Sequence, residues 1–236
     1  MGQEEIADFE ARRAQARAKL DAIDPALTAS GAAADPQRRE WFEAVYDLAQ
    51  GDAAAVPWAR SAAFPLLAQW LAQRGPLNGL RAVDVGCGLG DNAEALAAAG
   101  ARVTAFDLVE SAADWARRRF PNSAVTYCAA DLFAPPDAWR GAFDLVHECY
   151  TLQALPDALL PAAAQALAAL VAPRGALLVI SRAREEEGAV GGPPWPLTRA
   201  QIEGLAVDGL RLKTLEDIAA DGDLVRHWRA LFRRDA

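Results

Sequence analysis

Three glycines stand close together in VDVGCGLG (residues 83–90), between an apolar run and a following helical pattern. A side chain in such a connection would keep a ligand away from the backbone, so the composition predicts a tight strand-to-helix turn that a nucleotide-like ligand can reach. A sharp connection without any ligand gives the same pattern. The turn therefore restricts the possible folds, whereas the residues around it are needed to predict the function.

Beyond Pro76 the chain alternates short apolar runs with helical stretches, which is typical of crossover units around a parallel sheet. Near the end, Asp221–Asp223 predicts a turn between two antiparallel strands. We therefore predict an α/β fold with a doubly wound, seven-stranded, mostly parallel, Rossmann-like sheet. Its five parallel strands are expected within residues 80–86, 101–107, 124–131, 142–150 and 175–182, with a helix over 161–172.

The part before this core is helical in pattern. A charged first segment ends at Asp24-Pro25, and a small, polar stretch follows it. Two amphipathic segments, 39–50 and 65–75, then predict helices on either side of a loop that contains Pro57 and Trp58. We expect an N-terminal helix and flexible joint over 1–36 and one domain over 37–236, made of a helical cap (37–79) and a Rossmann-like core (80–236).

The bulk composition excludes several classes of function. A chain of 236 residues with 53% hydrophobic content can bury the core of one ordinary domain, and its formal charge of −8 opposes a grip on nucleic acid. The three cysteines have neither zinc-site nor disulfide-framework spacing and fit a reducing cytosol. No signal peptide or membrane-spanning run is recognisable. We expect a soluble, cytoplasmic protein without metal, membrane or nucleic-acid partner, and a monomer, although the sequence does not fix the oligomeric state.

The glycine spacing indicates the kind of ligand. The turn reads GxGxG, with Gly86, Gly88 and Gly90 preceded by Asp84, whereas the dinucleotide fingerprint is GxGxxG. Asp91 follows at the start of the predicted helix, where a carboxylate would repel a pyrophosphate but tolerate a cationic sulfonium and ammonium group. The ligand is therefore expected to carry no phosphate.

Two further acids end the next two predicted strands. Asp107 is placed to accept both ribose hydroxyls of an adenosine. Asp131 is placed to accept a hydrogen bond from an adenine amino group, with Leu132 and Phe133 as apolar contacts to the ring. Taken singly, each acid is more often a loop residue or a helix cap than a ligand contact. Their position at successive strand ends, where ligands bind in open parallel sheets, supports a nucleoside site.

With these residues, VDVGCGLG and the acids in AFDLVES and AADLF, the sequence resembles the class I S-adenosylmethionine-dependent methyltransferases over roughly residues 80–181. In that family the glycine turn faces the methionine part of the cofactor, the second-strand acid holds the ribose and the third-strand acid meets the adenine. The resemblance implies S-adenosylmethionine as cofactor. The family's roles in binding the cofactor carry over to Gly86, Gly88, Gly90, Asp107 and Asp131. We also expect cofactor contacts from Asp84, Leu108 and Leu132.

Two outlying segments, AVPWARSAAFPLL (55–67) and GGPPWPLTRAQI (191–202), look like those of thiopurine, thiol and halide methyltransferases. In that group a PW-containing loop closes over the cofactor, and a GPP-aromatic segment borders the acceptor pocket. Core packing is the alternative for Trp58 and Trp195. The resemblance implies cofactor contact for Trp58, and we expect substrate contacts from Trp41, Pro194 and Trp195.

The fourth predicted strand and the residues after it (143–156) depart from the family pattern, so no catalytic role is carried over there. Alternation along the strand sends His147 and Cys149 to one side and Glu148 and Tyr150 to the other. We expect Glu148 to orient the acceptor or take its proton and Tyr150 to hydrogen-bond it. Capping or loop-satisfying roles for these two residues are the alternative, and a thiolate acceptor needs no base.

The resemblance implies methyl transfer from S-adenosylmethionine to a small-molecule acceptor by direct in-line displacement, with a thiol sulfur preferred. An O- or N-methyltransferase of a secondary-metabolite pathway and a non-catalytic S-adenosylmethionine-binding protein are the alternatives. A nicotinamide-dependent oxidoreductase is disfavoured by the glycine spacing and by the absence of a Tyr-x-x-x-Lys pair.

Overall fold

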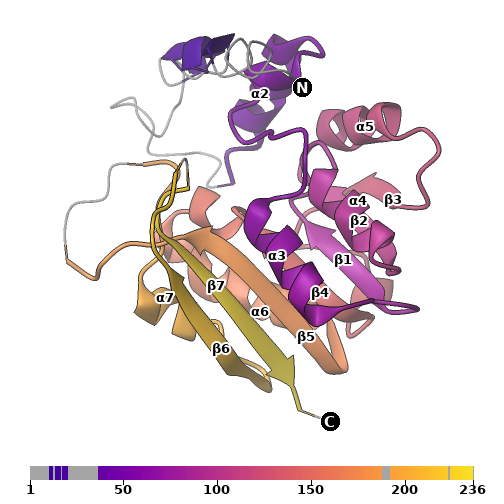
Figure 1. The fold of residues 1–236 in the computed structure, drawn as a ribbon, viewed down its shortest axis with the longest axis vertical. Coiled ribbons are helices and arrows are strands. Elements are labelled where there is room, and N and C mark those ends of the chain that lie inside the picture. The colour runs from indigo at the N-terminus through magenta and orange to yellow at the C-terminus, as the bar shows by residue number, and fades with distance from the viewer. Residues whose placement is uncertain are drawn as a thin grey trace.

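The computed structural model describes residues 11–12, 14–16, 18–20, 37–187, 192–222 and 224–235. They form a seven-stranded sheet in the order β3-β2-β1-β4-β5-β7-β6 with helices on both faces (Figure 1). Neighbours from β3 to β5 are parallel, and β7 pairs antiparallel with both β5 and β6. The predicted fold class is confirmed, including the antiparallel pair at the end of the chain.

The strands are β1 (Arg81–Val85), β2 (Arg102–Asp107), β3 (Thr126–Ala129), β4 (Phe143–Cys149), β5 (Val171–Arg182), β6 (Leu210–Ile218) and β7 (His227–Arg234). The α-helices of the described residues are α2 (Arg39–Ala49), α3 (Pro65–Arg74), α4 (Asp91–Ala98), α5 (Glu110–Arg119), α6 (Leu160–Leu170) and α7 (Arg199–Glu203). Short 3-10 turns lie at Ala53–Ala55, Asp137–Trp139, Leu152–Ala154 and Asp157–Leu159.

Alternate residues of the central strands enter two separate apolar cores. In β4, Leu145 packs with residues of α3 and α4, whereas its neighbour Val146 packs with residues of α6 and α7. Figure 1 shows α3 on the near face of the sheet and α6 behind it. Because both faces are covered, the strands are almost continuously apolar, as a doubly wound sheet requires.

The predicted helix over 161–172 ends earlier than expected. Helix α6 stops at Leu170, and Val171 already belongs to β5, where it pairs with Phe143 of β4. Helix propensity in this alanine- and leucine-rich run is therefore overridden by strand pairing at the sheet.

A third apolar cluster joins the N-terminal part to the cap. The described residues between 11 and 20 are helical, and Leu20 is buried beside Val45 and Tyr46 of α2. The joint predicted between this helix and α2 lies outside the described residues. As expected, α2 and α3 flank the Pro-Trp loop (residues 50–64). Within the described residues, no helix combines the length and apolarity that a bilayer crossing needs.

Arg229 of β7 ties the antiparallel edge to α3. Its guanidinium is buried and donates to both carboxylate oxygens of Glu216 on β6, at 2.8 and 2.6 Å. It also donates to the Leu66 carbonyl and the Gln69 side chain of α3, both at 2.9 Å. One side chain of β7 thus satisfies acceptors on two other elements, β6 and α3.

We expect Arg229→Ala to lower the free energy of unfolding by about 2–3 kcal/mol, because the hydrogen bonds from a buried charged group to Glu216 and to Gln69 are lost. Urea denaturation measures this change. Arg211→Ala is the matched control: its guanidinium is exposed and pairs with Asp235 at 2.5 Å on the same sheet, so the loss should stay within about 1 kcal/mol. Equal losses for the two variants would contradict the anchoring role.

Candidate active site

A cavity of about 280 Å³ lies at the carboxyl ends of the parallel strands, at the lower end of the volume range of small-molecule sites. The glycine turn after β1, the end of β2 and the loop after β4 form its floor, and α2 and the Pro-Trp loop cover it. Of the residues predicted to bind ligand or substrate, the lining includes Trp41, Trp58, Gly86, Gly88, Asp107, Leu108, Leu132, Tyr150 and Pro194.

Close packing requires glycine at position 86. Its φ of +66° lies in the left-handed region, and a Cβ there would stand 2.3 Å from the Thr151 hydroxyl oxygen. That hydroxyl donates to the Val85 carbonyl at 3.0 Å, so it cannot turn away without losing the bond. The turn after β1 therefore passes directly against the loop after β4.

Asp107 stands at the end of β2, as predicted. Its carboxylate accepts the Gly88 N–H at 2.9 Å and the Val109 N–H at 3.4 Å. Burial raises its pKa, and the hydrogen bonds from the backbone oppose that rise. Beside it, the Leu108 carbonyl accepts from the Arg39 guanidinium at 2.6 Å. A carboxylate held in this way suits a ligand that offers hydroxyl donors.

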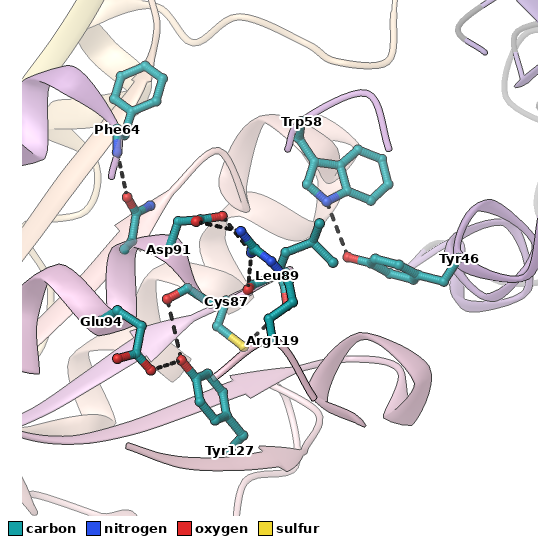
Figure 2. A network of polar contacts seen from close by, with 12 residues as sticks. Tyr46, Trp58, Phe64, Cys87, Leu89, Asp91, Glu94, Arg119 and Tyr127 are labelled. Atoms are coloured by element: carbon teal, nitrogen blue, oxygen red, sulfur yellow. Dashed lines mark hydrogen bonds and ion pairs between the residues drawn. The ribbon is translucent and has the colours of Figure 1, made fainter. Parts of the chain in front are cut away.

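Trp58 covers the glycine turn. A Cβ on Gly88 would lie 3.4 Å from the Trp58 indole nitrogen, which donates to the Tyr46 hydroxyl at 3.2 Å (Figure 2). Trp41 and Phe42 complete an aromatic cluster, with ring centroids 5.9 and 5.5 Å from that of Trp58. The predicted position of Trp58 beside the turn is therefore found, and so is that of Trp41 at the cavity.

Asp91 does line the cavity, but its charge is balanced. Arg119 at the end of α5 donates to both carboxylate oxygens at 2.8 and 2.9 Å (Figure 2). Both side chains are largely buried. Because Arg119 neutralises the Asp91 carboxylate, Asp91 gives little support to the expectation that this site repels a phosphate.

Asp84 does not line the cavity, which corrects its assignment as a direct cofactor contact. Its side chain is buried within the sheet and pairs with the Nδ1 of His147 at 2.6 Å. The two residues lie opposite each other in the β1–β4 pairing. The acid before the glycines thus contacts a neighbouring strand instead of the ligand space.

Gly90 and Asp131 also lie outside the cavity lining. A Cβ on Gly90 would stand 2.6 Å from the Tyr127 hydroxyl, so this glycine admits a tyrosine of β3. The Asp131 carboxylate accepts the Phe133 N–H at 2.8 Å and the Gln37 side-chain amide at 3.1 Å. Phe133 and Gln37 themselves line the cavity, and Asp131 positions both of them.

The predicted pairing of Glu148 and Tyr150 on one side is wrong. Glu148 is fully buried outside the cavity and accepts the Leu152 N–H at 2.8 Å. The strand ends at Cys149, and Tyr150 adopts a φ of +74°, which breaks the alternation and turns its ring into the cavity. Burial raises the pKa of Glu148 to about 8. Glu148 therefore has the capping role that the sequence left as its alternative.

Tyr150 has a partner that the sequence did not reveal. Its hydroxyl lies 2.6 Å from the Nε2 of His227, the first residue of β7, whose Nδ1 is hydrogen-bonded to the Val225 carbonyl. A carbonyl only accepts, so Nδ1 carries the proton and the tyrosine donates to Nε2. Burial lowers the pKa of His227. The chain has only two histidines, and that scarcity was the one available signal for this residue.

The GPP segment reaches the cavity through its prolines. Pro193 and Pro194 line it, whereas Trp195 does not and instead packs on Gly192, where a Cβ would stand 2.2 Å from the indole ring. The backbone N–H of Trp195 donates to the backbone carbonyl of Gln153 at 2.7 Å. Direct substrate contact by Trp195 is therefore corrected, because its ring supports the segment from outside the cavity.

No group of three or more potential metal ligands of the His, Cys, Asp or Glu type gathers in the part of the chain that the structure describes. Cys149 lines the cavity, and burial raises the pKa of its thiol well above the usual range. The thiol is therefore protonated at neutral pH and is a poor nucleophile.

The strand order, the glycine turn and Asp107 at the end of β2 are arranged as in the Rossmann-like methyltransferase fold. Residues 82–175 match the family described as "Methyltransferase domain", which confirms the predicted class.

The relatives and the solved structure that this chain resembles are also named as methyltransferases. The ubiquinone biosynthesis O-methyltransferase of Aromatoleum aromaticum is 40% identical over 116 residues, 47% of each chain. A probable thiol methyltransferase of Arabidopsis thaliana is 27% identical over 162 residues, 66% of this chain and 69% of the relative. The structure of magnesium protoporphyrin IX methyltransferase from Synechocystis PCC 6803 with bound SAM shares the fold, with a TM-score of 0.65, 20% identity and coverage of 86% and 99%. The chain matches about half the length of the ubiquinone biosynthesis O-methyltransferases to which it is similar.

We expect Gly86→Ala to destabilise the fold more than Gly141→Ala. Gly141 has a similar φ of +61° but no atom within 4 Å of the point where a Cβ would stand, so its variant bears only the left-handed backbone cost of about 1–2 kcal/mol. Contact with Thr151 should add about 1–3 kcal/mol at position 86. In a Thr151→Ala background this extra loss should vanish in urea denaturation. An equal cost at the two glycines would refute the close approach.

The Glu148 carboxyl predicts a pH-dependent stability. With a pKa of about 8 in the folded chain and a usual value of 4.5, the folded protein holds one more proton than the unfolded chain between these values. Stability therefore falls as pH rises through this window, by at most about 1.4 kcal/mol per pH unit.

Glu148→Gln cannot ionise and keeps an acceptor for Leu152, so its stability relative to the native chain should rise from about pH 5 to 8 and then level off. Urea denaturation across this range measures the difference. Glu203→Gln, at a half-exposed position, is the control and should show no such trend. Parallel curves for the native chain and Glu148→Gln would rule out a raised pKa.

Proposed function

We propose that this chain transfers the methyl group of S-adenosylmethionine to a small-molecule acceptor, with a thiol sulfur as the preferred nucleophile. The observation that carries the proposal is the junction of Gly88 and Asp107 at one edge of the cavity, at 2.9 Å, within a methyltransferase domain. This edge is where ligands bind in open parallel sheets.

The residues present fit an adenosyl cofactor. Asp107 offers carboxylate oxygens to ribose hydroxyls, and Leu132 and Phe133 offer apolar surface to the base. Trp58 excludes water from the glycine turn and presents an aromatic ring, which attracts a cation such as a sulfonium. When bound, the cofactor supplies an electrophilic methyl carbon on a positively charged sulfur.

Tyr150 and His227 are the groups proposed to hold the proton of the acceptor. The tyrosine proton points at Nε2, so its oxygen can act as an acceptor, both for the Arg182 guanidinium and for an S–H or O–H group of the substrate. His227 is neutral at pH 7 because its pKa is lowered, and it can receive the proton through Tyr150. Positioning of the two substrates in the cavity then supplies most of the remaining rate enhancement.

The preference for sulfur has limited but specific support. Both segments that look like thiol methyltransferases, the Pro-Trp loop and the GPP segment, reach the cavity, and the named thiol methyltransferase aligns with 66% of this chain. Transfer to oxygen is the second candidate. It is favoured by the 40% identity to a ubiquinone O-methyltransferase and by the Tyr150–His227 pair, since a hydroxyl needs a base more than a thiol does.

We expect Asp107→Asn to weaken S-adenosylhomocysteine binding about 10- to 100-fold, because charge-assisted hydrogen bonds are replaced by neutral ones. Calorimetric titration measures the affinity, and Asp144→Asn is the control because its carboxylate pairs with Arg81 at the opposite end of the strands. Binding of NADH in place of S-adenosylhomocysteine would overturn the cofactor assignment.

The same protein is then assayed for methyl transfer to a panel of thiols and phenols. Turnover of thiols alone supports sulfur, and turnover of phenols alone favours the second candidate. Binding of S-adenosylhomocysteine without any turnover would contradict the proposed activity towards this acceptor class while leaving the cofactor assignment intact.

A further inference from the structure

The cavity has a second end that the cofactor-binding residues do not account for. Asp107, on β2, lies on one side of β1, whereas β4, β5 and β7 follow on the other side. At this other side, Arg182 ends β5 and pairs in register with His227 of β7. Tyr150, after β4, joins them. This is the side left for the acceptor once an adenosyl group occupies the β2 end.

Two guanidinium groups flank an aromatic cluster there. Arg182 lies over the Tyr150 ring at 5.6 Å, and Arg60 of the Pro-Trp loop lies over the Phe64 ring at 5.3 Å. The Phe64 and Tyr150 rings are 5.0 Å apart, and Phe64 is 5.4 Å from His227. Burial has the largest effect on the pKa of His227, and the charges of Arg182 and Arg60 lower this pKa further. Both guanidinium groups therefore lie close enough to the imidazole of His227 to act on it electrostatically.

These two charges are not balanced by acids. Across the described ranges, no carboxylate forms an ion pair with Arg60 or Arg182, and the Nε of Arg182 is buried without a hydrogen-bond partner. The acids that line the cavity, Asp91 and Asp107, already hold Arg119 and backbone N–H groups. Guanidinium groups stay charged at any physiological pH, and a partly buried cation is stabilised by an anion at hydrogen-bonding distance.

We propose that the methyl acceptor carries a carboxylate, which Arg182 and Arg60 bind, and an apolar or aromatic body that rests against Phe64 and Tyr150. The planar fork of a guanidinium matches a carboxylate in a bidentate fashion. This inference rests on the proposed function, since it concerns the acceptor of that reaction. It narrows the acceptor to small carboxylic acids in a chain whose net charge of −8 would otherwise repel them.

The test uses benzoate as a probe and benzamide as its uncharged match, titrated into protein saturated with S-adenosylhomocysteine. Benzoate should bind at least 10-fold more tightly than benzamide. Arg182→Gln and Arg60→Gln should each weaken benzoate about 10-fold and leave benzamide within 2-fold. Arg182→Lys keeps the charge and serves if the glutamine variant fails to fold. Arg211→Gln removes one exposed charge elsewhere and should change nothing.

S-adenosylhomocysteine also carries a carboxylate, so its own affinity is measured for every variant and should stay within 2-fold. If Arg182→Gln and Arg60→Gln weaken S-adenosylhomocysteine instead of benzoate, the arginines serve the cofactor and the inference is overturned. Equal binding of benzoate and benzamide likewise overturns it, while the proposed function stands. Failure of the native protein to bind S-adenosylhomocysteine removes the proposed function and the inference with it.

Discussion

The turn after β1 passes so close to the loop after β4 that only a hydrogen atom fits between them at position 86. Thr151 fills the remaining space and donates to the Val85 carbonyl. Two residues further on, the Gly88 N–H donates to Asp107 and brings in the end of β2. Three strand ends are therefore tied by contacts within a few residues of one another, and the cavity exists because these contacts leave its floor free of side chains.

The features that sequence predicted correctly depend on local chemistry. A glycine turn and the acid at the end of the next strand, Asp107, are set by the residues around them, and the strand order follows from alternating helices and strands. The features it missed depend on geometry between distant segments. Tyr150 faces the cavity because its φ of +74° breaks the strand alternation, and His227 meets it because β5 and β7 pair in one particular register. Neither the sequence of β5 nor that of β7 contains a pattern that predicts the register in which the two strands pair.

The buried polar side chains at the centre of the sheet help to fix how the strands pair. Asp84 and His147 satisfy one another across β1 and β4, although Asp84 Oδ2 and His147 Nε2 lack partners among the described residues. Their neighbour Glu148 lies on the opposite face, where it caps the following turn. A shift of one residue in the β1–β4 pairing would move each of these side chains to the wrong face, leaving buried polar atoms unpaired. The polar residues thus oppose register slippage that an entirely apolar pair of strands would tolerate.

The aromatic side chains above Gly88 hold one another in place. Trp58 donates to Tyr46, and its ring packs against Trp41 and Phe42. Much of the conformational entropy that a loose covering loop would lose on binding is therefore lost when the chain folds. A small ligand entering this cavity meets a surface that is already ordered, so more of its interaction energy remains as affinity.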